Sequence, residues 1–312
     1  MATPATAAAA SVPISAAWTK GIDFRNTRRI ACSRLASCYK RFGEQTRSLP
    51  GSVATTSQRI VSERPGIMRM QPNTDQRTRR AVRGFAAVET WVFDLDNTLY
   101  PHDVNLWQQV DVRIRDYIAD FLKLSHDEAF RLQKDLYRRY GTSLRGLMEE
   151  HGLEPDEFLE MVHDIDYSPL TPTPALGSAI ARLPGRKLIL TNGTRAHAEA
   201  VMGRLEIRSG FEDIFDIASA ELEPKPRAIV YDRFFARHNV DPARAAIFED
   251  LSRNLEVPHA RGMTTVLVVP VGTREVFREE WELSGRDEPH VDHVTDDLAG
   301  FLHAIMAKHG PA

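Results

Sequence analysis

The chain has 312 residues, 42% of them hydrophobic and 27% charged, which is enough to bury a core and excludes a disulfide-rich miniprotein, a collagen-like repeat and a fully disordered chain. No apolar run approaches the roughly 18 residues of a membrane-spanning helix, so we expect no membrane partner. The net charge of −3 is uneven: residues 1–85 carry 15 Lys and Arg against 4 Asp and Glu, whereas the acidic remainder carries 25 against 39 and is unsuited to binding nucleic acid.

The first 86 residues are predicted to form a basic, disordered leader. They are Ala-rich and then Ser-, Thr- and Arg-rich, and they cannot bury enough surface to offset the entropy lost on ordering. Such a composition is typical of an organelle transit peptide, but we favour an overextended start, with initiation at Met68 or Met70. We therefore expect a cytoplasmic protein, or an organellar one if the leader is a genuine transit peptide. Both cysteines, Cys32 and Cys38, lie in this leader, which excludes a cysteine nucleophile or a zinc–thiolate site from the rest of the chain.

The remaining residues are predicted to alternate between strands and helices. A short apolar strand at 91–93 precedes a helical stretch from 104 to 170, which glycines and a proline break into several helices and which ends in an extended linker. Further strands are predicted at 187–190, 214–217, 246–248 and 265–269, with helices at 195–205, 226–238 and 252–261. Repeated βα units indicate an α/β fold, with a parallel sheet covered by helices on both faces.

Polar residues stand at the ends of the predicted strands, where ligands bind in parallel sheets. They are Asp94 and Asp96 after the first strand, Thr191-Asn192-Gly193 after the second, Lys225 beyond the third, and Glu249-Asp250 after the fourth. A carboxylate such as Asp94 can attack phosphorus and hold the group as an acyl phosphate. Asp96 could protonate the leaving oxygen and later deprotonate the attacking water. The set suits phosphoryl transfer from a small phosphorylated metabolite through an aspartyl-phosphate.

This chemistry requires a cation between the nucleophile and its substrate. A carboxylate at about 3.5 Å from a phosphate dianion is repelled by on the order of 9 kcal/mol at an effective dielectric constant of 20. We therefore expect Mg²⁺, which prefers oxygen ligands, and Glu249 and Asp250 would complete its site together with Asp94.

The other strand-end residues would act on the phosphoryl group. Lys225 would neutralise further charge, while Thr191 and the amides of Asn192 and Gly193 could hydrogen-bond the phosphoryl oxygens. Each residue type also has an ordinary structural explanation, such as a turn, a surface charge or a helix N-cap. All four together, each at a strand end and in this order, favour a functional site.

The order of these motifs resembles one known family. Motifs one to four of the haloacid dehalogenase (HAD) superfamily are similar to Asp94-Leu95-Asp96-Asn97-Thr98-Leu99, Leu190-Thr191-Asn192-Gly193, Pro224-Lys225-Pro226 and Phe248-Glu249-Asp250. The resemblance spans about residues 88–300 and implies a Rossmann-like, three-layer core at 87–102 and 171–312, with a helical cap domain at 103–170. It further implies that Asp94 is the nucleophile and Asp96 the general acid and base. Mg²⁺ would be held by the Asp94 carboxylate, the Asp96 backbone carbonyl and Asp250, with Glu249 assisting directly or through water.

Finer features resemble the pyrimidine 5′-nucleotidase branch of this superfamily. They are the segments 94–100 (DLDNTLY), 140–147 (YGTSLRGL) and 291–297 (VDHVTDD). The resemblance implies hydrolysis of UMP- or CMP-like monophosphates, with Tyr140 and Thr142 in the nucleoside pocket. A structural role is equally compatible with this segment, since Tyr140 fits a helix face and either Thr142 or Ser143 a helix N-cap.

Other functions stay open at this point. A sugar-phosphate or phosphoglycolate-type phosphatase, or a phosphomutase, would have the same core. A binding protein on an inactive phosphatase scaffold is a further alternative, and the intact Asp94, Asp96, Lys225 and Asp250 argue against it. Asp96 and the Glu249-Asp250 pair also disfavour a hydrolytic dehalogenase, whose chemistry needs no metal. We expect a monomer or a homodimer.

Overall fold

The structure, a computed structural model, describes residues 82–271 and 285–309. The predicted leader up to position 81, including both cysteines, lies outside the described residues. Among the helices that are described, none has the length and apolar character needed to cross a bilayer.

A six-stranded parallel sheet forms the centre of the fold. In chain order its strands are β1 (Thr90–Phe93), β2 (Arg186–Leu190), β3 (Asp213–Phe215), β4 (Ala245–Glu249), β5 (Thr264–Val268) and β6 (His293–Thr295). Their spatial order is β3-β2-β1-β4-β5-β6, so the direction of winding reverses between β1 and β4. Ligands bind at such a reversal point, beyond the carboxyl ends of the strands. The first five strands confirm the predicted ones to within two residues, whereas β6 was not predicted.

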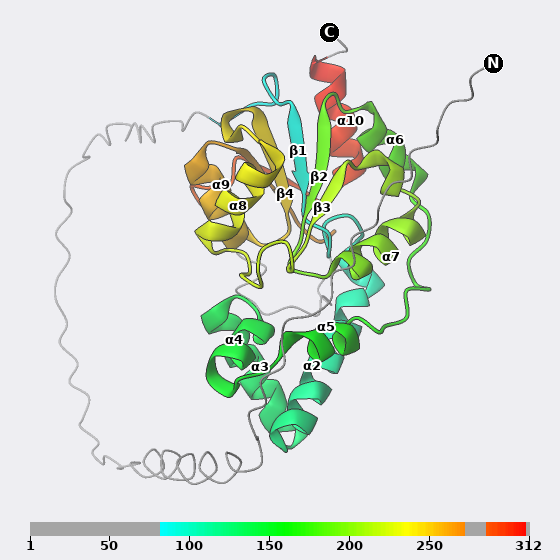
Figure 1. The fold of residues 1–312 in the computed structure, drawn as a ribbon. Helices are drawn as coiled ribbons and strands as arrows, with labels where there is room; N and C mark the ends of the chain where they lie inside the picture. Colours follow the sequence, from blue (N-terminus) through cyan, green and yellow to red (C-terminus); the bar gives the residue numbers. More distant parts are fainter. Residues whose placement is uncertain (1–81, 272–284, 310–312) are drawn as a thin grey trace, which may run out of the picture. The chain divides into compact units, whose positions relative to one another are not determined.

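Helices cover both faces of the sheet, which confirms the three-layer α/β architecture (Figure 1). One face carries α6 (Pro174–Arg182), α7 (Arg195–Leu205) and α10 (Leu298–His309), and the other carries α8 (Ala228–His238) and α9 (Ser252–Arg261). Short 3₁₀ helices lie at His102–Val104, Arg208–Gly210 and Pro242–Arg244. Successive side chains of a strand point to opposite faces of the sheet and so enter different hydrophobic clusters. Trp91 and Phe93 of β1 join the cluster with α6, α7 and α10, whereas Val92 joins the cluster with α8 and α9.

The helical stretch after β1 has a hydrophobic core of its own. Its four helices are α2 (Leu106–Leu122), α3 (His126–Tyr140), α4 (Ser143–His151) and α5 (Pro155–Val162). As the sequence predicts, Gly141 ends α3 in the left-handed region at φ +87°, and the Thr142 hydroxyl caps α4 by accepting the Arg145 N–H at 3.2 Å. We call these four helices the cap and the sheet with its flanking helices the core.

The core begins a few residues before the predicted boundary at residue 87. Phe85 is buried, and its ring lies 6.0 Å from that of Trp91. The Arg83 guanidinium donates to the carbonyls of His259 at 3.0 Å and Met263 at 2.9 Å. Residues 83–86, which composition assigned to the leader, are therefore held against the core by both apolar and polar contacts.

Candidate active site

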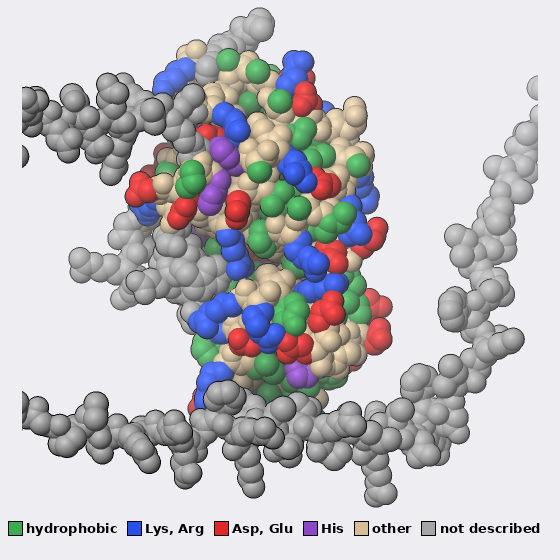
Figure 2. Space-filling model, turned by 90° about the vertical axis from the view of Figure 1, so that its left-hand side faces the viewer, with side chains coloured by type: hydrophobic (Ala, Val, Ile, Leu, Met, Phe, Trp, Pro, Cys, Tyr) green, Lys and Arg blue, Asp and Glu red, His purple; other side chains and the backbone are tan. Residues whose placement is uncertain are grey.

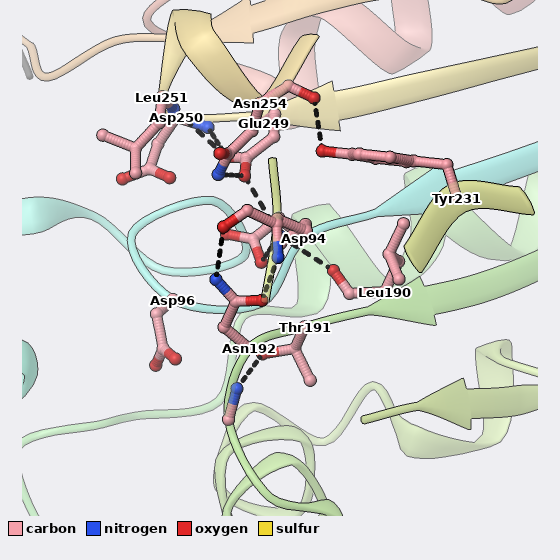
Figure 3. Close-up of polar contacts among 12 residues, drawn as sticks. Asp94, Asp96, Leu190, Thr191, Asn192, Tyr231, Glu249, Asp250, Leu251 and Asn254 are labelled. Atoms are coloured by element: carbon pink, nitrogen blue, oxygen red, sulfur yellow. Dashed lines mark hydrogen bonds and ion pairs between the residues drawn. The ribbon is translucent and has the colours of Figure 1, made fainter. Parts of the chain in front are cut away.

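The residues that follow β1, β2 and β4 converge at the carboxyl edge of the sheet (Figure 3). The Asp94 N–H donates to the Phe248 carbonyl at 2.9 Å, and the Thr191 N–H donates to the Phe215 carbonyl at 3.0 Å. These bonds continue the sheet pairing past the ends of the strands. The backbone of both predicted site residues is thus fixed by the sheet itself.

Lys225 reaches into this edge from the loop between β3 and α8. Its side chain is 2% exposed, and its ammonium group donates to Asp94 Oδ1 at 2.7 Å, Glu249 Oε1 at 3.0 Å and the Leu190 carbonyl at 3.0 Å. Burial alone would lower the pKa of Lys225, but the charges of Asp94 and Glu249 outweigh it and raise this pKa above its usual value. An ammonium group has three N–H donors, and all three are engaged here. Lys225 is therefore a buried cation that holds the two carboxylates in place.

The Thr191-Asn192-Gly193 turn has two roles: it holds the backbone of Lys225, and it faces the cavity described below. The Asn192 side chain accepts the Lys225 backbone N–H at 2.8 Å and donates to the Lys225 carbonyl at 3.4 Å. The Gly193 N–H donates to Thr191 Oγ1 at 2.9 Å, and a hydroxyl that accepts one bond can still donate its own hydrogen. The Asn192 amide is thus used to orient the lysine loop, while the Thr191 hydroxyl can serve a phosphoryl oxygen. The substrate-binding roles of Asn192 and Gly193 stay predictions.

Glu249 is the most deeply buried of the predicted metal ligands. Its Oε2 accepts the backbone N–H groups of Asp250 at 2.6 Å and Leu251 at 3.1 Å, and its Oε1 accepts bonds from Lys225 and the Asn254 side chain. These four bonds fix the turn that presents Asp250. Glu249 therefore organises the acidic pair, and its part as a direct metal ligand stays a prediction.

Three buried carboxylates lie close enough to share one cation. Ligand oxygens of Asp94, Glu249 and Asp250 all lie within 4.8 Å of one another. Burial and the Glu249 charge raise the pKa of Asp94 to about 7, against the opposing effect of Lys225. The three carboxylates supply hard oxygen donors, with Lys225 beside Asp94 and Glu249, and with His102 Nε2 at 3.7 Å from Asp250. The donor set therefore fits Mg²⁺.

Asp96 occupies a different environment from these three carboxylates. Its side chain points away from Glu249 and Asp250 in Figure 3, and among the described residues it is not part of their cluster. Its Oδ1 accepts the Tyr100 hydroxyl at 2.6 Å and lies 2.8 Å from His197 Nε2. Burial would raise the pKa of Asp96, but the charge and hydrogen bond of His197, with that of Tyr100, lower it to about 2. The part of the Asp96 backbone carbonyl as a metal ligand, which the resemblance implies, stays a prediction.

His197 is an important site residue that the sequence-based prediction did not assign. The Tyr167 hydroxyl lies 3.0 Å from the His163 carbonyl, to which it can donate, and 2.9 Å from His197 Nδ1. His197 Nε2 lies 2.8 Å from Asp96 Oδ1, and its charge and hydrogen bond contribute to the low pKa of Asp96. The signal available in the sequence was a histidine in the first turn of the helix that follows a strand-end motif.

A cavity between core and cap opens onto Asp94, and Thr142 and Thr191 also line it. Tyr140 is not among its lining residues, and its part in binding substrate stays a prediction. As the last residue of α3, Tyr140 donates its hydroxyl to Glu150 at 2.8 Å, and Arg139 lies 4.9 Å from its ring.

Ionic and aromatic contacts join the cap to the core beside the cavity. Arg145 of α4 pairs with Glu223 at 3.2 Å, and the Arg253 guanidinium of α9 lies 4.7 Å from the Tyr137 ring of α3. Lys and Arg side chains gather on this side of the molecule where core and cap meet (Figure 2). At Gly141 an added Cβ would lie 3.0 Å from the Lys225 carbonyl, so the glycine permits this close approach of cap and lysine loop.

Comparisons with known proteins agree with this architecture. A family model described as haloacid dehalogenase-like hydrolase matches residues 88–257, a range that contains all the strand-end residues discussed above. Among solved structures, the chain is similar to the L-2-haloacid dehalogenase from Xanthobacter autotrophicus with chloropropionic acid covalently bound (18% identity over 72% of this chain and 100% of that one, TM-score 0.46). It is also similar to a HAD phosphatase from Thermococcus onnurineus (16% identity, 72% and 98%, TM-score 0.46). A HAD family hydrolase from Deinococcus radiodurans R1 with bound phosphate and sodium is a third similar structure (19% identity, 73% and 100%, TM-score 0.44).

Proposed function

Because the chain belongs to the haloacid dehalogenase-like hydrolase family, we propose that it is a Mg²⁺-dependent phosphatase of small phosphomonoesters that forms an aspartyl-phosphate on Asp94. The observation that supports this most directly is the cluster of buried carboxylates around Lys225 at the floor of the cavity. Displacement of a halide from a neutral carbon creates no need for so much charge beside the nucleophile. A phosphate dianion and a divalent cation together match it.

The proposed reaction has two displacements at phosphorus. An Asp94 oxygen attacks, the bond from phosphorus to the ester oxygen breaks, and the departing oxygen takes a proton from the Asp96–His197 pair. A water then attacks the phosphoryl group and gives its proton to Asp96, and the bond between phosphorus and Asp94 breaks to release phosphate. Lys225 keeps Asp94 oriented in both steps, and Thr191 donates to a phosphoryl oxygen. Mg²⁺ held by Asp94, Asp250 and the Asp96 carbonyl would neutralise the charge shared by carboxylate and phosphate.

We assign the substrate to the pyrimidine nucleoside 5′-monophosphates. The support is the resemblance of residues 94–100, 140–147 and 291–297 to the pyrimidine 5′-nucleotidase branch, together with a cavity that extends from Asp94 into the cap. Sugar-phosphate phosphatase or phosphomutase activity is the alternative. An inactive binding scaffold is disfavoured because the cluster around Asp94 is complete.

A substrate panel tests this proposal. We expect phosphate release from p-nitrophenyl phosphate, UMP and CMP in the presence of Mg²⁺, no release in EDTA, and lower kcat/KM for ribose 5-phosphate and phosphoglycolate. Chloride release from 2-chloropropionate without any phosphatase activity would overturn the phosphatase assignment. Good activity on sugar phosphates with none on CMP or UMP would overturn only the nucleotide assignment.

The Asp96–His197 pair gives a prediction that depends on the leaving group. His197→Gln keeps a polar side chain beside Asp96 but removes its proton supply, so kcat/KM for UMP is expected to fall by about 10²-fold or more. For p-nitrophenyl phosphate, whose leaving group departs without protonation, kcat/KM is expected to fall by less than about tenfold.

His163→Gln is the matched control, because the two imidazole rings lie 4.7 Å apart. Burial and the nearby His197 lower the pKa of His163 to about 4, so it supplies no proton at neutral pH. Equal decreases in kcat/KM for UMP and p-nitrophenyl phosphate in the His197 variant would show that His197 has only a structural role.

A further inference from the structure

We propose that Gln133, on cap helix α3, is the acceptor that recognises an N–H group on the base of the substrate. This inference rests on the proposed phosphatase function and adds a subsite to it. Gln133 is 2% exposed and lines the same cavity as Asp94. Its Oε1 is buried and has no hydrogen-bond partner among the described residues.

The orientation of the Gln133 amide is fixed by Asp111 of α2. Gln133 Nε2 donates to Asp111 Oδ1 at 2.7 Å and to the Asp111 carbonyl at 3.1 Å. Both partners can only accept, so the NH₂ group must face Asp111 and Oε1 must face elsewhere. Lys134 donates to the same carboxylate oxygen at 2.9 Å, and the Ser143 hydroxyl donates to the Gln133 carbonyl at 3.2 Å. The acceptor is therefore held in place before any ligand arrives.

A ligand that donates to Gln133 Oε1 relieves an unfavourable feature of the empty cap. Buried acceptors in proteins are almost always hydrogen-bonded, and an unpaired one is costly. Gln133 and Asp94 line one cavity, and the proposal requires a single small molecule to contact both. Its phosphate would lie at the core end and its donor group at the cap end.

The remaining lining residues limit the chemistry of that donor. Arg253 and the Lys134–Asp111 ion pair also line the cavity, and a neutral N–H donor is compatible with these charges. The other walls at the cap end are largely apolar, formed by Trp107, Val110, Ile114, Leu144, Phe158 and Leu159. Such walls suit a flat heterocycle and would leave the hydroxyls of a second sugar unpaired. Uracil N3–H and the cytosine amino group both present a neutral N–H at the ring edge.

The test compares substrates that differ only at this edge. We expect wild-type kcat/KM to be about 10- to 100-fold lower for N3-methyl-UMP than for UMP, because the methyl group replaces the donor. Gln133→Met, which has no acceptor, is expected to lower kcat/KM for UMP by a similar factor and to remove the discrimination between the two. For ribose 5-phosphate, which lacks a base, the substitution is expected to change kcat/KM by less than about twofold.

Gln109→Met is the matched control, because Gln109 lies on α2 with its side-chain amide bound to the Asp166 backbone and is not among the lining residues. Equal wild-type kcat/KM for UMP and N3-methyl-UMP overturns the subsite without recourse to any variant. Hydrolysis of ribose 5-phosphate or p-nitrophenyl phosphate but of no nucleotide overturns the subsite and leaves the phosphatase function intact. Absence of phosphate release from every phosphomonoester overturns both.

Discussion

Asp94→Asn is expected to lower kcat by about 10⁴-fold or more, since the amide cannot form the phosphorylated intermediate. The same substitution is expected to stabilise the Mg²⁺-free protein above pH 7. Burial and the Glu249 charge raise the pKa of Asp94 to about 7, from an ordinary value of 3.8. A variant that is inactive and yet more stable would separate the chemical role of this carboxylate from any structural one.

The sign of the pH effect follows from proton binding. The folded protein holds the Asp94 proton more tightly than the unfolded chain does, so this contribution to stability is complete below about pH 3.8. It is lost as pH rises through about 7, where the buried group ionises. Asparagine stays neutral and keeps an oxygen that accepts from Lys225. We therefore expect the variant to exceed wild type by a few kcal/mol at pH 8 and by little at pH 5.

Urea denaturation in EDTA at pH 5 and pH 8 measures this difference, and phosphate release measures the activity. Asp120→Asn, an exposed change on α2, is the control and is expected to alter neither. Mg²⁺ is expected to stabilise wild type more than the Asp94 variant, because only wild type offers the third charged oxygen donor. A stability difference that is independent of pH would contradict the argument, as would substantial residual turnover.

The strand-end residues could be predicted from the sequence because short apolar runs located β1, β2 and β4. In a parallel sheet the carboxyl ends of the strands lie at one edge, so locating the strands also predicts that Asp94, Thr191 and Glu249 lie close together. Lys225 was a weaker case, because nine loop residues separate it from the end of β3, and its motif rather than any periodicity identified it.

Contacts between distant side chains left no comparable pattern in the sequence. The Asp96–His197 bond joins residues 101 positions apart, and the tyrosine that orients the imidazole comes from a third segment. Tyr140 shows a second difficulty, because helical periodicity does not reveal that its hydroxyl donates to Glu150, ten positions along the chain. β6 spans only three residues, too few for a period of two to stand out.

Lys225→Met is expected to have the largest effect on stability, because it removes the cation that bridges two buried carboxylates. Asp94 and Glu249 would then face each other without compensation, and breaking a buried ion pair from one side typically costs about 3–5 kcal/mol. We expect this loss in EDTA at pH 8, and a smaller loss at pH 5, where Asp94 is protonated. Turnover is expected to fall by at least about 10³-fold, because the nucleophile loses its orientation.

A double-mutant cycle identifies which charge Lys225 compensates. If the lysine acts chiefly on ionised Asp94, then Asp94→Asn combined with Lys225→Met should be destabilised by clearly less than Lys225→Met alone. Mg²⁺ should likewise restore part of the stability of the single Lys225 variant, since a divalent cation at the carboxylate cluster replaces the missing charge. Lys308→Met, an exposed change on α10, controls for the loss of a lysine as such. Destabilisation by Lys225→Met that is the same at both pH values, and undiminished by Asp94→Asn, would mean that the lysine stabilises the fold through Glu249 and the Leu190 carbonyl, and that its contact with the nucleophile is incidental.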